Sequence, residues 1–530
     1  MSHKLRMKSL VVALGLAVAT LACAAAPGGS KVVARAAALH TGDMVTGPMS
    51  LAQSMRVSVS LQLRNEAQLQ AFIANPNHPN LTPAQFTAQY GPSEADANAV
   101  AAWLTQHGFS DVSISSNRLL VSATAPVAAV QSAFHTNLVR VHTHDGRNAF
   151  ANSSDAAVPT SLHGVSGVLG LQTVHVPHPI GHVMKGKPGG GGGSIIGHNP
   201  TQFPSIYGGT SLPTAAGVTV GIISNGDLTQ TLSDLNTFTS QNGLATVTTQ
   251  IVNTGGTGTD TSGTAEWDLD SQDIVGMGGG QVGKIVFYNI PTLLNSSMVA
   301  DFNTVVNANV AKVINVSLGE CETSAQGDGS AAAADAIFQQ ADAQGQTFSV
   351  SSGDSGSNEC GRGGPRGTTP SWPASSPYVV AVGGTTLNAT TTTWQGETVW
   401  SGTGGSPSTF EPIPSWQVGV GQNAGSQYRG VPDIAFDADP NSGAIIIVNG
   451  SQAQYGGTSL SSPLFVGFWA RMIAAKGTGI GFAAPKLYAL PSTAFHDVVS
   501  GSNGGETAAP GWDYTTGFGS IIMNKASTSL

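Results

Sequence analysis

The chain has 530 residues, which excludes a single ordinary domain and predicts two or three folded units. Hydrophobic residues make up 40% of it, enough for real cores, whereas charged residues make up only 10%, where about a quarter is usual. The 68 glycines and the polar but weakly charged composition are typical of secreted proteins that work in acid. Beyond the N-terminus, no segment has the roughly 18 apolar residues needed to span a bilayer.

Residues 1–26 are predicted to be a secretory signal peptide. The apolar stretch LVVALGLAVATLACAAA ends in small residues and follows a basic start that contains Lys4, Arg6 and Lys8. A single transmembrane anchor is the alternative, but the apolar run is short and its exit is rich in alanine.

The chain contains three cysteines. Cys23 lies in the signal and is a candidate for lipid attachment, although the residues before it fit such a site poorly. Once the signal is removed, Cys321 and Cys360 remain. An even pair in an exported chain predicts a disulfide, and two buried free thiols are the alternative.

The stretch MKGKPGGGGGS predicts a flexible linker, which we place at residues 185–195. Charge divides there: residues 1–189 contain 12 Lys or Arg and 7 Asp or Glu, whereas the rest contains 9 and 23. The front half therefore carries a net charge of +5 and the back half −14, so the two halves attract each other. Eleven of the 13 histidines also precede the linker.

Residues 50–176 have the pattern of a compact α+β unit. Alternating or short apolar runs predict strands at 55–62, 118–125 and 138–144, and helical patterns lie at 65–76, 93–108 and 126–136. The helix at 93–108 opens with a capping box, Ser93 followed by Asp96. This order of elements favours a ferredoxin-like sandwich, and it shows no cluster of catalytic residue types.

The back half alternates short apolar runs with helical segments such as 331–345. The runs lie at 217–224, 284–290, 310–319, 346–354 and 378–384, and they are typical of a parallel sheet buried on both faces. The pattern predicts an α/β domain of about 340 residues. Its working residues are expected at the carboxyl ends of the strands.

The stretch YGGTSLSSP, residues 455–463, precedes an apolar helical run and suits a serine nucleophile at the start of a helix. A serine hydroxyl needs a base to take its proton. A Ser-His-Asp triad would need a histidine in the back half, which contains only His198 and His496. Neither lies in a context that favours this role.

A second stretch, SSGDSGSNECG at residues 351–361, resembles two protease signatures. Gly353 to Gly356 is similar to the nucleophile segment of chymotrypsin-type proteases, which need a partner histidine and an all-β double barrel. Asp354-Ser355-Gly356 is similar to one arm of an aspartic protease, but the nearest second arm, DTSG at residue 260, has the wrong spacing. Both interpretations are weak.

Carboxylates remain as candidate bases. The segment 262–277 is predicted to be a helix, and Glu266 and Asp270 fall at i and i+4 on one face. Two acids so placed repel each other by roughly a few tenths of a kcal/mol, which argues against a surface pair without a function. Spacing alone leaves both a catalytic pair and a solvated acidic face open, and we expect Asp268 and Asp273 to be solvated.

The motifs GTSLSSP, AEWDLD and SSGD together resemble the sedolisin family, serine-carboxyl peptidases with a subtilisin-like fold, especially its bacterial xanthomonalisin/pseudomonalisin branch. The front half resembles the kumamolisin-type activation propeptide, in LTPAQFTAQYGPSEADANAVAAWLTQHGF and LLVSATAPVAAVQSAFHTNL. The resemblance covers residues 50–520, and the joint presence of the motifs is highly specific. It implies a subtilisin-like α/β catalytic domain at 189–530, with a parallel sheet flanked by helices, after an α+β ferredoxin-like propeptide at 27–188.

The resemblance implies four catalytic roles: nucleophile for Ser459, general base for Glu266, orienting acid for Asp270 and oxyanion-hole acid for Asp354. It also implies a disulfide between Cys321 and Cys360. The base must be ionised to accept a proton, whereas the oxyanion acid must be protonated to donate a hydrogen bond. These opposite demands predict a bell-shaped pH profile centred well below neutral.

The C-terminal stretch HDVVSGSNGGETAAPGWDYTTGFGS sets two aspartates among glycines and small residues. Calcium prefers carboxylates and backbone carbonyls, which such loops present easily, and a plain solvated loop is the alternative. The resemblance implies one structural Ca²⁺ held by Asp497, Asp513 and the carbonyl oxygens of Val498, Ala509 and Gly511. Ala509 departs from the usual glycine but keeps its carbonyl.

We therefore expect a secreted, acid-acting serine-carboxyl endopeptidase, made as a proenzyme and inhibited by its own propeptide, with protein or peptide substrates. Cleavage is expected in the linker, around 183–195, and the many propeptide histidines are suited to sensing acid. We expect a monomer that binds neither nucleic acid nor, once the signal is removed, a membrane. The alternatives are a catalytically silent calcium-binding homologue, disfavoured by four filled catalytic positions, and a neutral-pH subtilisin-like hydrolase, disfavoured by the missing histidine.

Overall fold

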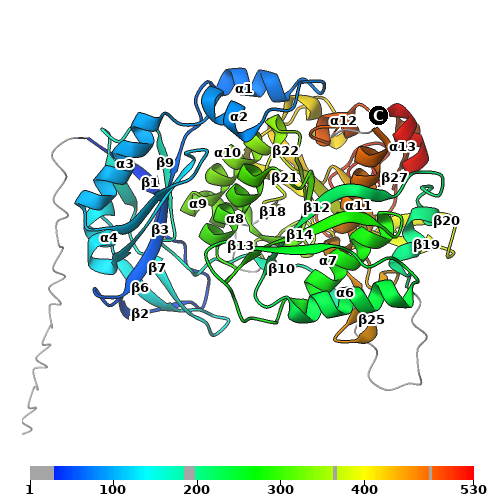
Figure 1. Ribbon diagram of the computed structural model, residues 1–530, viewed down its shortest axis with the longest axis horizontal. Helices are drawn as coiled ribbons and strands as arrows, with labels where there is room; N and C mark the ends of the chain where they lie inside the picture. The colour runs from blue at the N-terminus through cyan, green and yellow to red at the C-terminus, as the bar shows by residue number, and fades with distance from the viewer. Residues whose placement is uncertain (1–28, 184–196, 362–366, 477–479) are drawn as a thin grey trace, which may run out of the picture.

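A computed structural model of the chain shows two domains side by side: a front domain, and the α/β domain that the sequence predicts to be catalytic, which we call the catalytic domain (Figure 1). It describes residues 29–183, 197–361, 367–476 and 480–530. The predicted signal peptide (1–26) and linker (185–195) lie outside these residues. Within them, no helix is long and apolar enough to cross a membrane.

The core of the front domain is an antiparallel sheet of four strands. Their order in the sheet is β4 (Ser110–Ile114), β5 (Leu120–Pro126), β3 (Ser54–Leu61), β9 (Val165–Leu169). Helices α3 (Glu94–Gln106) and α4 (Val127–Phe134) cover one face (Figure 1). The first and third strands in the chain are central and the second and fourth are at the edges. This is the ferredoxin-like arrangement, so the predicted sandwich is confirmed.

Strand β3 shows how the sequence sets the two faces of this sheet. Val57 and Val59 belong to the apolar core shared with α3 and α4. Ser58 and Ser60, which alternate with them, are buried on the other face, where Ser60 Oγ lies 2.9 Å from Ser166 Oγ. This second face packs on the catalytic domain, since β9 contacts helices α9 (Glu322–Asp328) and α10 (Ser330–Ala343).

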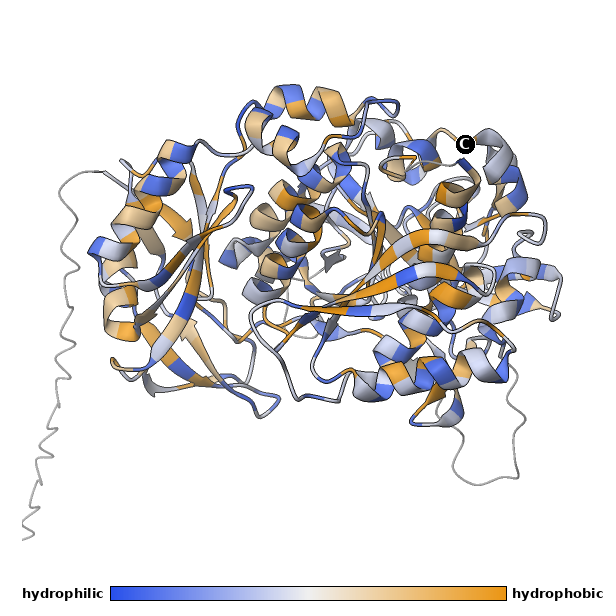
Figure 2. Ribbon diagram, viewed as in Figure 1, coloured by the Kyte–Doolittle hydropathy of each residue, from blue (hydrophilic) through white to orange (hydrophobic). Residues whose placement is uncertain are grey.

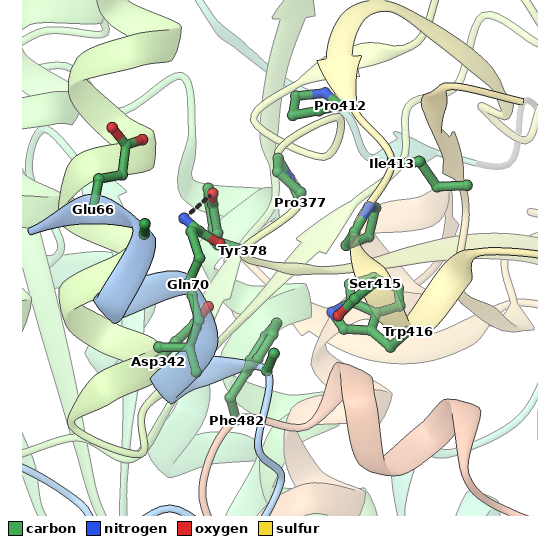
Figure 3. Close-up of a pocket in the computed structure, with 14 residues that line it drawn as sticks. Glu66, Gln70, Asp342, Pro377, Tyr378, Pro412, Ile413, Ser415, Trp416 and Phe482 are labelled. Atoms are coloured by element: carbon green, nitrogen blue, oxygen red, sulfur yellow. Dashed lines mark hydrogen bonds between the residues drawn. The ribbon is translucent and has the colours of Figure 1, made fainter.

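Helix α1 (Glu66–Ile73) forms a second contact between the domains. Gln70 Nε2 donates a hydrogen bond to the Tyr378 hydroxyl at 2.6 Å (Figure 3). It also donates to Gln339 Oε1 at 2.8 Å. A cavity of about 580 Å³ lies beside these contacts, with side chains of both domains in its wall.

The catalytic domain is built on an eight-stranded sheet. Along the sheet its strands are β13 (Thr249–Asn253), β14 (Val282–Ile290), β12 (Ala215–Asn225), β15 (Val313–Val316), β17 (Thr347–Ser351), β19 (Val380–Ala389) and β20 (Trp394–Val399), and β23 (Ile434–Asp437) also pairs with β19. All pairs are parallel except β19–β20. The predicted apolar runs form β12, β14, β15, β17 and β19, and Figure 2 shows apolar residues along these central strands.

Helices cover both faces of this sheet, as predicted for a subtilisin-like α/β domain. Helices α6 (Thr229–Gln241), α7 (Thr264–Met277) and α11 (Thr458–Lys476) lie on one side, and α8 (Asn295–Ala308) and α10 on the other (Figure 1). Helix α11 is buried along almost its whole length and contacts α7, β12 and β19. A helix that is apolar all round belongs in a core, which is where α11 lies.

Smaller sheets and helices complete both domains. In the front domain β1 (Ser30–Ala34) pairs with β8 (Ala156–Pro159), and β6 (Leu138–His142) lies between β2 (Met44–Pro48) and β7 (Asn148–Asn152). In the catalytic domain the pairs are β16 (Leu318–Cys321) with β18 (Ser371–Trp372), β21 (Ser406–Pro412) with β22 (Tyr428–Val431), β24 (Ala444–Val448) with β25 (Ser451–Gly456), and β26 (Phe495–His496) with β27 (Ser520–Ile521). The remaining helices are α2 (Pro83–Gln89), α5 (Phe203–Ile206), α12 (Ala484–Tyr488) and α13 (Met523–Ser529).

The last described residues of the front domain cross the catalytic domain as an extended segment, residues 175–183, which we call the tail. Strand β10 (His178–Pro179) pairs antiparallel with β16, and β11 (His182–Val183) pairs antiparallel with β25. The tail therefore adds a strand to two separate edges of the catalytic domain. The predicted disulfide is present, since Cys321 at the end of β16 is bonded to Cys360.

Candidate active site

Ser459 lies in the first turn of α11 and is fully buried. The two other serines of this turn have structural hydrogen bonds: Ser461 Oγ donates to the carbonyl of Asp437 at 2.9 Å, and Ser462 Oγ donates to Asn315 Oδ1 at 2.7 Å. Ser459 Oγ makes no such structural hydrogen bond to a described residue and has the Glu266 carboxyl group as its polar neighbour. Of the three serines, only Ser459 has a hydroxyl that is not used in packing.

Glu266 lies in the first turn of α7 and is buried beside Ser459. Its Oε2 accepts a hydrogen bond from the Gly181 backbone N–H of the tail at 2.9 Å. Burial raises the pKa of Glu266 to about 7, although the nearby Ser459 hydroxyl and the tail backbone favour the charged form. Asp270 follows one turn later, and its Oδ1 accepts the Ser317 hydroxyl at 2.6 Å. Burial, followed by the charge of Glu266, raises the pKa of Asp270 well above its ordinary value.

The expectation that Asp268 and Asp273 are solvated is wrong. Both side chains are fully buried, because α7 packs between α6, α11 and β24 and has no solvent-facing side. Burial, followed by the charge of Asp234, raises the pKa of Asp268 to about 9. Burial, followed by the charge of Asp437, raises the pKa of Asp273 well above its ordinary value.

Asp354 follows the carboxyl end of β17, as expected for a working residue of a parallel sheet. Its Oδ1 accepts hydrogen bonds from the Thr458 backbone N–H and from the Thr458 hydroxyl, both at 2.8 Å, which holds the carboxyl group at the start of α11. Burial raises the pKa of Asp354 well above its ordinary value. The neighbouring Ser355 is exposed, and its backbone N–H donates to Glu359.

The tail passes between Glu266 and Asp354, and its backbone comes so close to its surroundings that glycine is required both in the tail, at Gly181, and in the catalytic domain, at Gly457. A Cβ at Gly181 would lie 2.4 Å from Glu266 Oε2. Gly457 has a φ of +108°, and a Cβ there would lie 2.5 Å from Asp354 Oδ2 and 3.0 Å from the carbonyl oxygen of Ile180. The Ile180–Gly181 peptide bond therefore lies between the carboxyl groups of Glu266 and Asp354.

Sequence reasoning missed the tail as part of this site. In the segment HPIGHV, the sequence offers only one glycine between two short stretches. This pattern is too weak to predict strands of two residues. Ser317 and Thr458 were also missed, because their roles depend on the side chains that the fold brings beside them. His198 and His496 are explained by packing, since His198 lies against Phe203 and His496 stacks on Trp394 with ring centroids 3.7 Å apart.

The predicted calcium ligands lie together at the C-terminal end of the domain. Backbone N–H groups tie the two aspartates into one loop: Gly511 donates to Asp497 Oδ2 at 2.8 Å, and Ala509 donates to Asp513 Oδ2 at 2.9 Å. Asp513 and Val498 are buried, and Asp497 is exposed. Two carboxylates and three carbonyls are an all-oxygen donor set of the kind calcium prefers, so the residues fit that ion.

Comparison with known proteins agrees with both halves of the fold. The profile described as Pro-kumamolisin, activation domain, matches residues 42–174, and that of the subtilase family matches residues 216–518. The chain is 46% identical to sedolisin from Pseudomonas sp. (strain 101), over 91% of this chain and 88% of that protein. It is 45% identical to xanthomonalisin from Xanthomonas sp. (strain T-22), of whose length it spans 65%, and 30% identical to kumamolisin from Bacillus sp. (strain MN-32).

Among solved structures, Pseudomonas sedolisin, a serine-carboxyl proteinase complexed with two molecules of pseudo-iodotyrostatin, aligns with a TM-score of 0.61 and 49% identity. The alignment covers 63% of this chain and 98% of that one. Fold and matches together define a subtilisin-type peptidase preceded by an activation domain. Within this class, the identity over most of both chains shows that the protein belongs to the sedolisin family of serine-carboxyl peptidases.

Proposed function

We propose that this chain is the secreted proenzyme of an acid-acting endopeptidase in which Ser459 is the nucleophile and Glu266 its base. The observation that carries the proposal is the Gly181 N–H, which lies 2.9 Å from Glu266 Oε2. In serine-type peptide hydrolysis the base returns the serine proton to the nitrogen of the leaving group. The Gly181 nitrogen lies within hydrogen-bond distance of the proposed base, as a leaving nitrogen must, which supports binding of the tail in the manner of a substrate.

The side chains divide the chemistry between them. Ser459 Oγ attacks the carbonyl carbon while Glu266 takes its proton, and Asp270 holds Glu266 in position one turn away on α7. The protonated Asp354 donates a hydrogen bond to the developing oxyanion. Return of the proton to the leaving nitrogen frees the amine and leaves an acyl group on Ser459, which water then hydrolyses with Glu266 again as base.

The pKa values support action in acid. Asp354 stays protonated because burial raises its pKa well above its ordinary value, so it remains a donor. Glu266 must lose its proton to act, and burial beneath the tail contributes to a pKa of about 7. Release of the tail exposes Glu266 to water and lowers this pKa toward its ordinary value, which moves the active window of the mature enzyme into acid.

We further propose that residues 27–188 are the inhibitory propeptide and residues 189–530 the catalytic domain. The tail occupies the substrate position, with Ile180 buried against the β16 backbone at Gly319, so other peptides are kept out until it leaves. The register favours the Ile180–Gly181 bond as the first self-cleavage. A further cut around 183–195 falls almost wholly outside the described residues. Intact-mass analysis of the first acid-induced fragments tests this assignment, which predicts a fragment ending at Ile180.

We propose that the C-terminal loop holds one structural Ca²⁺ through Asp497, Asp513 and the carbonyls of Val498, Ala509 and Gly511. The ion would neutralise two carboxylates that lie in one loop and fix that loop in place. It takes no part in the reaction. The exposed Asp497 gives access for a chelator to remove it.

Hydrolysis of casein between roughly pH 2 and 8 tests the proposed function. The matured enzyme should be active below neutral pH, and Ser459→Ala and Glu266→Ala should abolish turnover. Ser355→Ala is the matched control, because Ser355 belongs to a protease-like motif but is exposed, and it should keep the activity. Activity that survives Ser459→Ala would refute the assignment. The signal peptide is tested in the same preparation, since the exported protein should lack residues 1–26.

A further inference from the structure

Three histidine rings meet at the junction of the two domains, outside the proposed catalytic residues. The ring centroids of His40 and His175 are 4.6 Å apart, and those of His40 and His144 are 5.3 Å apart. All three belong to the front domain and line a cavity of about 310 Å³, whose other wall is formed by the catalytic domain with Glu320, Ser324 and Glu359. The proposed chemistry of peptide hydrolysis uses none of these histidines.

The contacts of His175 satisfy the hydrogen bonds of an uncharged ring. Its Nε2 lies 2.6 Å from the carbonyl oxygen of Ala38, so Nε2 carries a proton and donates. Its Nδ1 lies 3.2 Å from Ser324 Oγ and can accept the hydroxyl proton. The neutral ring is therefore hydrogen-bonded at both nitrogens and joins the N-terminal arm, residues 35–43, to helix α9 of the catalytic domain. Burial, followed by the charge of His40, lowers the pKa of His175.

These contacts hold His175, the first residue of the inhibitory tail, in place. His175 stands three residues before β10, the strand with which the tail enters the active site. Next to it, Gln172 Nε2 donates to Asp328 Oδ2 of the catalytic domain at 2.7 Å. The arm is fixed at its other end, where the Arg35 N–H donates to the Gly327 carbonyl at 3.0 Å. Opening at His175 would therefore loosen both arm and tail.

The surrounding charges do not compensate for three imidazolium rings. Within the part of the chain that the structure describes, Asp43 is the carboxylate in direct contact: its Oδ1 lies 2.9 Å from His144 Nδ1 and its Oδ2 3.5 Å from His40 Nδ1. The other charged or titratable groups around the cavity are Asp145 and Arg147 on the β6–β7 turn, His178 in the tail, and Glu320, Asp328 and Glu359 of the catalytic domain.

At acidic pH the carboxyl groups of the catalytic domain provide little negative charge near these rings. Burial raises the pKa of Glu359 to about 7 and that of Glu320 well above its ordinary value, so both become neutral as the pH falls. Asp328 Oδ2 already accepts the amides of Gln172 and Asn295. Acidification therefore adds positive charge on the propeptide side of the cavity while the opposite wall loses negative charge.

We propose that His40, His144 and His175 form a protonation-sensitive latch, which holds the arm and tail on the catalytic domain while the His175 ring is neutral and releases them when that ring becomes charged beside His40. A histidine whose pKa is lowered in the closed state stabilises that state above its unperturbed pKa of about 6.5, and this stability is lost as the pH falls through the lowered value. The latch rests on the proposed function, because it regulates access to that same site. Repulsion between rings at these distances is worth on the order of tenfold in an equilibrium.

The first test uses the full-length Ser459→Ala proenzyme, which cannot cleave itself. Hydrogen exchange of the amides in residues 35–43 and 172–180, corrected for intrinsic rates, should rise on acidification in the parent protein. In the His175→Gln variant, whose side chain stays neutral, the rise should move to lower pH and be about tenfold smaller at a given acid pH. His163→Gln, an exposed histidine of the same domain, should behave like the parent.

A second readout does not require His175→Gln to fold normally. In otherwise wild-type proenzyme, Asp43→Asn removes the carboxylate that contacts His40 and His144, so maturation should begin at higher pH and run about tenfold faster near pH 6. Once matured, the wild-type and Asp43→Asn enzymes should hydrolyse casein at the same rate. Unchanged pH dependence of exchange and of maturation in these variants would overturn the latch. Failure of every variant to mature, with normal exchange behaviour, would overturn the proposed function instead.

Discussion

Replacement of Gly181 by alanine is expected to release the tail from the active site. The new Cβ would lie 2.4 Å from Glu266 Oε2, so one of the two groups has to move by about 1 Å to reach an ordinary contact distance. Such a movement breaks the 2.9 Å hydrogen bond from the Gly181 N–H to Glu266. A hydrogen bond to a charged group contributes about 1.5–3 kcal/mol, so the equilibrium constant for docking of the tail should fall by roughly tenfold to a hundredfold.

The assay is binding of a fluorescent peptide, VPHPIGHV, to the uncleavable Ser459→Ala proenzyme. This peptide repeats residues 176–183 and competes with the tail for the same strands. The Gly181→Ala proenzyme should bind it roughly ten to a hundred times more tightly in apparent affinity. Gly396→Ala is the control, because a Cβ at Gly396 meets nothing within 4 Å. Equal peptide affinity in the parent and Gly181→Ala proenzymes would show that the tail does not make this close contact with Glu266.

Three further outcomes are expected. Asp354→Asn keeps a donor that does not titrate, so the matured variant should retain part of its activity and its kcat/KM should persist to higher pH; an unchanged alkaline limb would count against Asp354 as the oxyanion acid. Burial, followed by the charge of Asp234, raises the pKa of Asp268 to about 9, so this group stabilises the fold fully below its unfolded pKa of about 4, and that stability is lost as the pH rises through 9. The melting temperature of Asp268→Asn, scanned against pH, should therefore fall less between pH 4 and 9 than that of the wild type, and parallel curves would contradict the burial argument. A calcium chelator should lower the melting temperature of the wild type but not of Asp497→Asn; if the wild type is also unaffected, the calcium site is wrong.

Much of the fold was predictable because buried parallel strands leave a strong signal in sequence. Runs such as 284–290 and 346–354 are apolar on both faces, and they became β14 and β17. The spacing of Glu266 and Asp270 likewise fixed them on one face of α7. Spacing could not show that the helix has no solvent side, because that depends on how α6, α11 and β24 pack around it. For this reason Asp268 and Asp273 were misjudged.

The tail shows the same limit at the active site. Strands of two residues, such as β10 and β11, have no periodicity to recognise, and their partners lie more than a hundred residues away in the chain. The glycine-rich linker predicted a boundary near residue 185, but the contacts of the tail with the candidate active site precede it. The candidate nucleophile and acids could be found from motifs, whereas the peptide bond that lies between them is visible only in three dimensions.

The pH dependence of kcat/KM for peptide hydrolysis by the matured enzyme tests the central claim most directly, because it reports the ionisation of base and oxyanion acid together. Ionised Glu266 and protonated Asp354 predict a bell-shaped profile centred well below neutral, which disappears in Glu266→Gln. Activity that rises through pH 7, or a profile that survives Glu266→Gln, would contradict the assignment of a glutamate as the base of Ser459.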